Sequence, residues 1–286
     1  MSARAWMRLL VVGLVAVDVP SGLAAQTGEC RPGGSSNEAK TLAILSVPAV
    51  FSPGAAPGGP SRVTLGIEAA RVPGVDPATA TPTICRPGKG PEHTDVLPAL
   101  ARPRVAVPLP HGLALEASWI PPVRVNGVKA NLFGVALMES VGHRDGLAAT
   151  VRAHATFGSV HAPVTCDRDE LGDPVSECFD GKLSDDRYSP NIMGVDLSVG
   201  WAMARGRLRP YLGSGYNRLE PRFQVNFTNQ FGDTDRTRVA VNLDRVALFG
   251  GAAWQLTDRL AITGEVYAAA ADAATGRVVI RQSLGS

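Results

Sequence analysis

Seven ionisable side chains occupy alternating positions in apolar segments, where they could act together in one polar interior. They are Glu68, Glu116, Arg152, His154, Asp196, Glu265 and Arg281. Their neighbours along each segment are mostly apolar, so the seven side chains share one face of an extended chain. Charged groups gathered inside a narrow structure usually pair with one another and fill it. We expect that arrangement, and we keep a polar pore or a small ligand site lined by these groups as the alternative.

His154 is the candidate catalytic residue. Thr156 lies two residues further along the same face, and Asp196 belongs to a segment that could lie alongside. Cleavage of a lipid, peptide or acyl bond needs a nucleophile or an activated water, a histidine base and an orienting carboxylate. No sequence signature of such an enzyme surrounds these residues. The sequence therefore predicts no catalytic site, and a hydrolase is the least favoured reading.

An acidic stretch in the middle of the chain is the candidate metal site. Asp167, Asp169 and Asp173 are spaced like the beginning of a calcium-binding loop. The fifth position of that loop is Leu171, however, and the twelfth is Cys178, where a bidentate Glu is needed. We therefore expect a solvated acidic loop, with no metal and no cofactor.

The cysteines form an even set, Cys30, Cys85, Cys166 and Cys178. In an exported chain, an even set points to disulfides formed in an oxidising compartment. Four cysteines allow three pairings. We favour Cys166–Cys178, which share one loop, together with Cys30–Cys85. The spacings match no zinc pattern, so a metal site is disfavoured.

Residues 1–25 are expected to be a signal peptide. Arg4 and Arg8 lead into an apolar run from Leu9 to Val19, and Gly22-Leu23-Ala24 gives a small-x-small cleavage pattern. The run is shorter than the about 20 apolar residues that a membrane helix needs. The formal net charge of the chain is +2, and its arginines form no basic cluster. Nucleic acid is therefore not an expected partner.

Long segments with alternating apolar side chains must position these residues. The alternation is found in 62–70, 113–119, 147–158, 193–204, 223–228, 246–256, 260–267 and 277–281. In 128–139 it is less regular, because Phe133, Val135 and Leu137 share a face with Lys129 and Asn131. Several segments exceed the about 5–6 residues usual in a soluble sheet. They match the about 9–11 residues that cross a bilayer at a tilt. Only helices and closed barrels satisfy every backbone group in lipid, so a chain that spans with strands must close into a barrel.

The connections between the segments support this prediction. Arg205-Gly206 and Thr257-Asp258 are tight turns, whereas the connections at 159–190 and 229–236 are polar and longer. Membrane barrels have short periplasmic turns and long extracellular loops in alternation. The sequence therefore predicts an all-β, antiparallel up-and-down transmembrane β-barrel of about 10 strands, within a range of about 8–12.

The expected domain organisation follows from the same pattern. Residues 26–60 form a loose N-terminal arm with room for one strand, and residues 61–286 form the barrel, with long extracellular loops at 72–101 and 159–190. For residues 26–100, extra strands, a plug and a cap tied by Cys30 and Cys85 are left open as alternatives. Aromatic residues near the predicted strand ends are candidates for interfacial girdles or for rim packing. They are Trp119, Phe157, Tyr188, Trp201, Tyr211, Tyr216 and Trp254.

The second half of the chain resembles small bacterial outer-membrane barrels of the OmpA/OmpW-like type. The segments that carry the resemblance are 209–216 (RPYLGSGY) and 249–267 (FGGAAWQLTDRLAITGEVY). They show a PY-x-G-x-G-Y strand, a Gly-rich strand, an LTDRL turn and a strand with an inward Glu. The chain departs from that family in ending without an aromatic residue and in its cysteine pairs. The resemblance implies a fold and carries no catalytic signature.

Taken together, the sequence predicts an exported bacterial outer-membrane protein with a structural or passive-transport, porin-like role, and not an enzyme. Its expected partners are outer-membrane lipid and a small solute. One alternative is a soluble secreted or periplasmic ligand-binding β-protein, and the less favoured one is an outer-membrane hydrolase. The discriminating feature is the face that carries Leu197, Val199 and Trp201, which points to lipid in a membrane barrel and inward in a soluble one.

Overall fold

The computed structural model of the chain describes residues 29–144 and 146–285. The predicted signal peptide lies outside the described residues. None of the helices in the described part is both long enough and apolar enough to cross a membrane.

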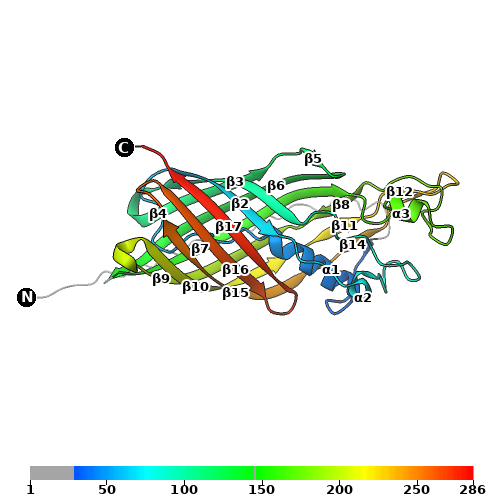
Figure 1. Cartoon of the computed structure of the whole chain (residues 1–286). Coiled ribbons are helices and arrows are strands. Elements are labelled where there is room, and N and C mark those ends of the chain that lie inside the picture. Colours follow the sequence, from blue (N-terminus) through cyan, green and yellow to red (C-terminus); the bar gives the residue numbers. More distant parts are fainter. Residues whose placement is uncertain (1–28, 145, 286) are drawn as a thin grey trace, which may run out of the picture.

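Ten antiparallel strands form a closed barrel, which confirms the predicted fold class and strand number (Figure 1). Each strand pairs with the next one around the barrel, and the last strand pairs with the first from Arg277↔Ala70 to Ser283↔Thr64. The barrel strands are β2 (Thr64–Arg71), β3 (Ala99–Pro108), β4 (Leu113–Ile120), β6 (Val128–Arg144), β7 (Leu147–Ala162), β9 (Ile192–Trp201), β10 (Leu208–Leu219), β15 (Leu243–Gln255), β16 (Leu260–Ala269) and β17 (Ala273–Ser283).

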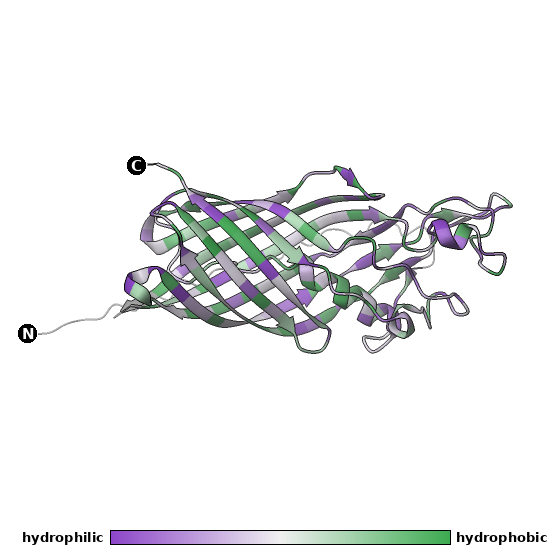
Figure 2. Cartoon of the chain, in the orientation of Figure 1, coloured by the Kyte–Doolittle hydropathy of each residue, from purple (hydrophilic) through white to green (hydrophobic). Residues whose placement is uncertain are grey.

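Apolar side chains point outward from the barrel. On β9, Leu197 is 51% exposed, whereas Asp196 beside it is only 3% exposed. The same alternation continues on the neighbouring strands, and Figure 2 shows hydrophobic and hydrophilic residues alternating along them. The less regular segment follows the rule too, with Phe133, Val135 and Leu137 outside. The predicted orientation of these faces is therefore the one that a membrane barrel needs.

The two ends of the barrel differ. One end has short connections, among them η2 (Pro110–Gly112), η3 (Ala204–Gly206) and the turn at 257–258, and the chain ends there (Figure 1). The other end carries a folded extension that we call the head, made of residues 29–46, 72–98, 163–191 and 220–242. The predicted long loops at 72–101 and 159–190 belong largely to this head.

Short strands extend the barrel sheet at the end that carries the head. β5 (Arg124–Val125) pairs with β6 beside the head, and β7 is followed in the sheet by β8 (Asp186–Ser189), β11 (Arg222–Gln224), β14 (Arg238–Ala240) and β1 (Glu29–Cys30). In the head, β12 (Phe227–Thr228) and β13 (Thr234–Asp235) form a separate two-stranded sheet. Two short helices, α2 (Pro77–Ala80) and α3 (Arg168–Leu171), complete the head. The segment around Phe223, expected in a barrel strand, belongs to the head.

The described part of the N-terminal segment, from residue 29 onward, has a defined structure, in contrast to the loose arm expected for residues 26–60. Helix α1 (Asn37–Ser46) begins at Ser36, whose hydroxyl accepts a hydrogen bond from the Ala39 amide at 3.1 Å. The single turn η1 (Val47–Ala49) follows. From there the chain runs through the barrel interior to β2. This segment has no alternating pattern of its own, and its binding partners lie on distant strands.

Candidate functional site

Residues 47–57 pass through the lumen of the barrel, and we call this segment the plug. Phe51 and Ser52 in its middle have 0% exposure. The plug has almost no regular structure, so its backbone groups need partners on the barrel wall. Those partners are the polar side chains that the strand alternation directs inward.

Five arginines donate hydrogen bonds to carbonyl oxygens of the plug. At one end of it, Arg277 reaches Val47 and Val50, both at 2.7 Å. At the other, Arg281 reaches Pro53 at 2.8 Å. The remaining donors are Arg102 to Ala49 and Val50, Arg104 to Ser52 and Pro53, and Arg152 to Phe51. The plug is therefore held mainly through its backbone, from strands on several sides of the barrel.

Buried carboxylates balance these arginines. Glu68 pairs with Arg102 at 2.6 Å and with Arg104. Glu116 lies 2.9 Å from both Arg104 and Arg281. Asp196 and Glu116 both contact Arg152, at 3.2 and 3.4 Å. Burying so many charges is tolerated only where each has partners. A connected network of this kind favours one arrangement of the plug.

Phe51 lies at the centre of the network. Its ring is contacted by three guanidinium groups, those of Arg104 at 4.4 Å, Arg152 at 4.7 Å and Arg102 at 5.1 Å from the ring centroid. Stacking of a guanidinium on an aromatic face is favourable, and more so where water is excluded. Phe51 therefore fills the space that the arginines enclose.

The structure places all seven predicted side chains on the inner face of the barrel. Five of them belong to the ion-pair network, as described above. Of the other two, Glu265 accepts hydrogen bonds from the Tyr211 hydroxyl at 2.9 Å and from the Gly54 amide at 3.1 Å. His154 lies 3.4 Å from Asp196.

Arg102, Arg104 and Arg277 were not among the predicted site residues. Arg102 and Arg104 are two residues apart, and Arg277 alternates with Val278. Since side chains two residues apart on a strand share one face, this alternation could have placed the three arginines on the inner face of the barrel. Gly213 and Gly215, which belong to the PY-x-G-x-G-Y motif, leave room for side chains that fill the lumen. A side chain there would collide with Phe249 or Asp196.

The hydrolase hypothesis required His154 and Asp196 to lie within reach of each other. Their nearest atoms, His154 Nε2 and Asp196 Oδ2, are 3.4 Å apart. The neighbouring Thr156 hydroxyl, however, donates to the Ala49 carbonyl of the plug at 3.0 Å. All three side chains are buried in the filled lumen. The group is therefore buried inside the barrel, and its hydroxyl is engaged by the plug.

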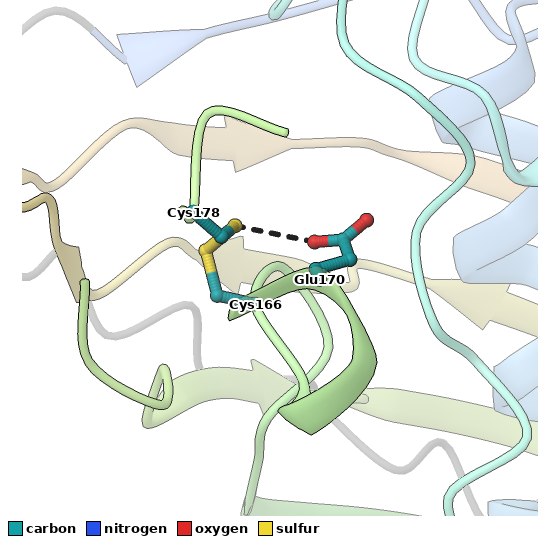
Figure 3. Close-up of side chains that lie close together, drawn as sticks. All are labelled: Cys166, Glu170 and Cys178. Carbon is teal, nitrogen blue, oxygen red and sulfur yellow. Dashed lines mark hydrogen bonds between the residues drawn. A yellow bond between two sulfur atoms is a disulfide. The ribbon is translucent and has the colours of Figure 1, made fainter. Parts of the chain in front are cut away.

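Both disulfides of the favoured pairing are formed, Cys30–Cys85 and Cys166–Cys178. The second belongs to the only group of potential metal ligands in the described residues, which Glu170 completes (Figure 3). The Glu170 carboxylate lies 3.2 Å from Cys178 Sγ. Metal ions bind the thiolate form of cysteine, and these two sulfurs are bonded to each other. The oxidised group therefore offers one carboxylate and no thiolate.

Aromatic side chains form two groups on the outer surface. Near the head, Trp119, Phe133 and Phe157 stack in a row, with ring centroids 5.9 and 5.7 Å apart. At the end with the short turns, Trp201 and Trp254 are exposed on β9 and β15. Two of the predicted girdle residues point elsewhere. Tyr211 lies in the lumen, and the Tyr188 hydroxyl contacts Ser46 in the head.

Comparison with solved structures finds small bacterial outer-membrane barrels. Ail, the attachment invasion locus protein of Yersinia pestis, is 10% identical with a TM-score of 0.34, covering 79% of this chain and 97% of that one. Neisserial surface protein A is 7% identical with a TM-score of 0.29, covering 78% and 97%. Omp33 of Acinetobacter baumannii is 7% identical with a TM-score of 0.30, covering 79% and 100%. No family model matches the chain, and no curated protein matches it.

Proposed function

We propose that this protein is an outer-membrane β-barrel whose lumen is closed by its own N-terminal segment, and whose working part is the extracellular head. In this proposal the barrel is an anchor that holds the head at the cell surface, and it does not conduct solutes passively. Of the two predicted roles, we therefore favour the structural role and not the porin-like one. The head is extracellular because membrane barrels carry their long loops outside and their short turns on the periplasmic side.

The spacing of the aromatic groups supports the membrane location. Leu147 pairs with Trp201 at one end of β7, and Phe157 lies at the other aromatic group. Ten steps of about 3.4 Å give about 34 Å along the strand. At the tilt of about 35–45° usual for such barrels, this corresponds to about 24–28 Å along the barrel axis. The apolar band of an outer-membrane barrel is about 25 Å tall.

The outward apolar face argues against the soluble alternative. Leu197 and Trp201 are 51% and 40% exposed. A monomeric soluble protein rarely exposes a contiguous apolar patch of more than a few hundred Å². A continuous apolar surface around the barrel is stable in lipid.

The closed lumen is inferred from the five arginines that donate hydrogen bonds to the backbone carbonyls of the plug. Release of the plug would exchange these hydrogen bonds from charged guanidinium groups for hydrogen bonds to water, and each of them contributes about 1.5–3 kcal/mol of net stability. Spontaneous release of the plug is therefore rare in the intact protein.

Conductance of the purified protein in planar bilayers tests the proposal. The wild type is expected to show no steady channel current. A variant with residues 48–54 replaced by a Gly/Ser sequence of equal length is expected to conduct, because the polar wall remains while the Phe51 ring is lost and the segment becomes a flexible linker that no longer fills the lumen. The same replacement in the exposed loop at 229–235 is the matched control and should leave the bilayer silent.

Heat-modifiable migration on a detergent gel must show that each variant contains a folded barrel. Steady conductance of the wild type, at the level of the plug variant, would overturn the closed lumen in favour of the porin-like role. A protein that fractionates with the soluble periplasmic extract would overturn the membrane location.

A further inference from the structure

A cavity of about 140 Å³ lies in the head, where it meets the barrel. Three walls enclose it. Helix α1 contributes Leu42 and Leu45, the 72–98 segment contributes Val96 and Leu97, and the remaining wall comes from the head ends of β6 and β7 and from the short strands β8, β11 and β14. The lining is overwhelmingly apolar. Pro48 and Ala49 of the plug also line the cavity, which therefore borders the lumen network.

Most polar side chains at this cavity are already engaged. Glu38 accepts hydrogen bonds from the backbone amides of Thr83, Ile84 and Cys85, at 2.7–2.9 Å. The Asp186 carboxylate accepts from four donors, namely the amides of Val164, Thr165 and Asn226 and the Ser184 hydroxyl. The Tyr188 hydroxyl contacts Ser46 at 2.6 Å. These groups stabilise the walls and leave little capacity for a ligand.

Glu92 differs from them. Its side chain is 9% exposed, and Oε1 pairs with Arg86 at 2.8 Å. Its second oxygen, Oε2, is buried and has no hydrogen-bond partner among the described residues. A buried carboxylate oxygen without a partner is costly, because the group has lost water and gained nothing in exchange. A donor from a bound molecule would remove that cost.

From the cavity and this unpaired oxygen, we infer that the head binds a small, neutral, apolar molecule carrying one hydrogen-bond donor, such as a phenol, with the donor directed to Glu92. An apolar cavity of about 150 Å³ in another protein is known to hold benzene, which sets the size of the ligand at about one six-membered ring. Anionic ligands are disfavoured, because the lining carries the carboxylates of Glu38, Glu92 and Asp186 against the single guanidinium of Arg86. Because Pro48 and Ala49 of the plug line this cavity, the inference rests on the closed lumen of the proposed function, which the conductance experiment tests separately.

Ligand-observed NMR titrations of the full protein in detergent test this site with three molecules of similar size. Phenol has the donor, anisole has the same ring without a donor, and benzoate is anionic. At about pH 8.5, above the Glu92 pKa of about 7, the carboxylate is ionised, and phenol is expected to bind saturably and at least about tenfold more tightly than anisole, since a hydrogen bond to a charged group is strong. Benzoate is expected to bind more weakly than either.

Three variants separate the ligand contact from the fold. Glu92→Met keeps the length of the side chain and should abolish the preference for phenol over anisole, while Arg86 retains Glu177 and Asp235. Glu92→Gln keeps an acceptor oxygen and should restore part of that preference. Leu45→Trp should fill the cavity and abolish saturable binding of both molecules. Val175→Trp, at a 91% exposed position, is the matched control and should bind like the wild type.

Several results would overturn the inference. Phenol that partitions into detergent without saturation, and equally in Leu45→Trp, would show that the cavity is not a binding site. Equal affinities of phenol and anisole in the wild type would remove the role of Glu92. Tighter binding of benzoate would reverse the assigned charge preference. Heat-modifiable migration and formation of Cys30–Cys85 in each variant show whether it is folded.

Discussion

Truncation of Phe51 is the most direct test of the plug. Phe51→Ala removes a side chain with 0% exposure from the centre of the lumen. Truncating a buried Phe costs about 3–5 kcal/mol. The three guanidinium groups on its ring add about 0.5–2 kcal/mol each in isolation, but they keep their carboxylate and carbonyl partners, so their contributions do not add in full. We expect the plug to be destabilised by about 4 kcal/mol relative to the barrel.

Amide hydrogen exchange measures this loss. Several plug amides have partners in the closed state, among them Val50, whose amide bonds to the Ser46 carbonyl at 3.1 Å, and Gly54, whose amide bonds to Glu265 at 3.1 Å. If these amides exchange only when the plug leaves the lumen, a cost of about 4 kcal/mol accelerates their exchange about a thousandfold. Amides in the middle of the barrel strands should keep their protection.

Phe231→Ala is the matched control, because that ring is 80% exposed in the head. An exposed substitution should change stability by no more than about 0.5 kcal/mol, which is about a twofold change in exchange. Plug amides that exchange at the wild-type rate in Phe51→Ala would refute the reasoning. A loss of protection throughout the barrel would refute it as well, since the plug would then not be a separate unit.

Three further predictions concern the lipid face, the head and its titration. Leu197→Arg should lower the free energy of barrel unfolding by about 2–4 kcal/mol, and Met203→Arg near the short turns by only about 0–1 kcal/mol, in urea unfolding with lipid vesicles. Replacing Cys30 and Cys85 by Ser opens a cross-link with a sequence separation of 55, and the head should lose about 4 kcal/mol, detected as faster proteolysis of residues 72–98. Burial raises the pKa of Glu92 to about 7, and Asp186 acts in the same direction against Arg86 and Lys89. Because the folded protein then holds this proton up to a higher pH than the unfolded chain, the stability of the head should fall as pH rises from about 4.5 to 7, by up to about 3 kcal/mol. Glu92→Gln should remove that part of the pH dependence in thermal melts, and an unchanged melting profile would contradict it.

The alternation of side chains was sufficient to predict the barrel. In residues 193–204, most of which form β9, the period of two predicted which face is apolar, and the structure has Leu197 outside and Asp196 inside. The local pattern is informative here because a strand in lipid must turn every second side chain outward. The cysteine pairing followed in the same way, since Cys166 and Cys178 share one loop.

The position of residues 47–57 could not be predicted from the sequence. The run VPAVF has no helical or strand period, and its partners, from Arg102 to Arg277, lie on strands far away in the chain. Its backbone carbonyls have no sequence signature, because every residue has one. The choice between a pore and a filled lumen therefore depended on which groups the closed barrel brings around the plug.

The cavity in the head was likewise a product of tertiary structure. Glu92 lies in a Pro/Gly-punctuated segment, where the sequence shows only a loop. Its burial results from α1, the 72–98 segment and the strand extensions meeting at one place. The sequence by itself determined the strands and their two faces, because these depend on neighbours two residues apart. The contents of the lumen and the lining of the cavity depend on residues brought together by barrel closure, and only the tertiary structure decided them.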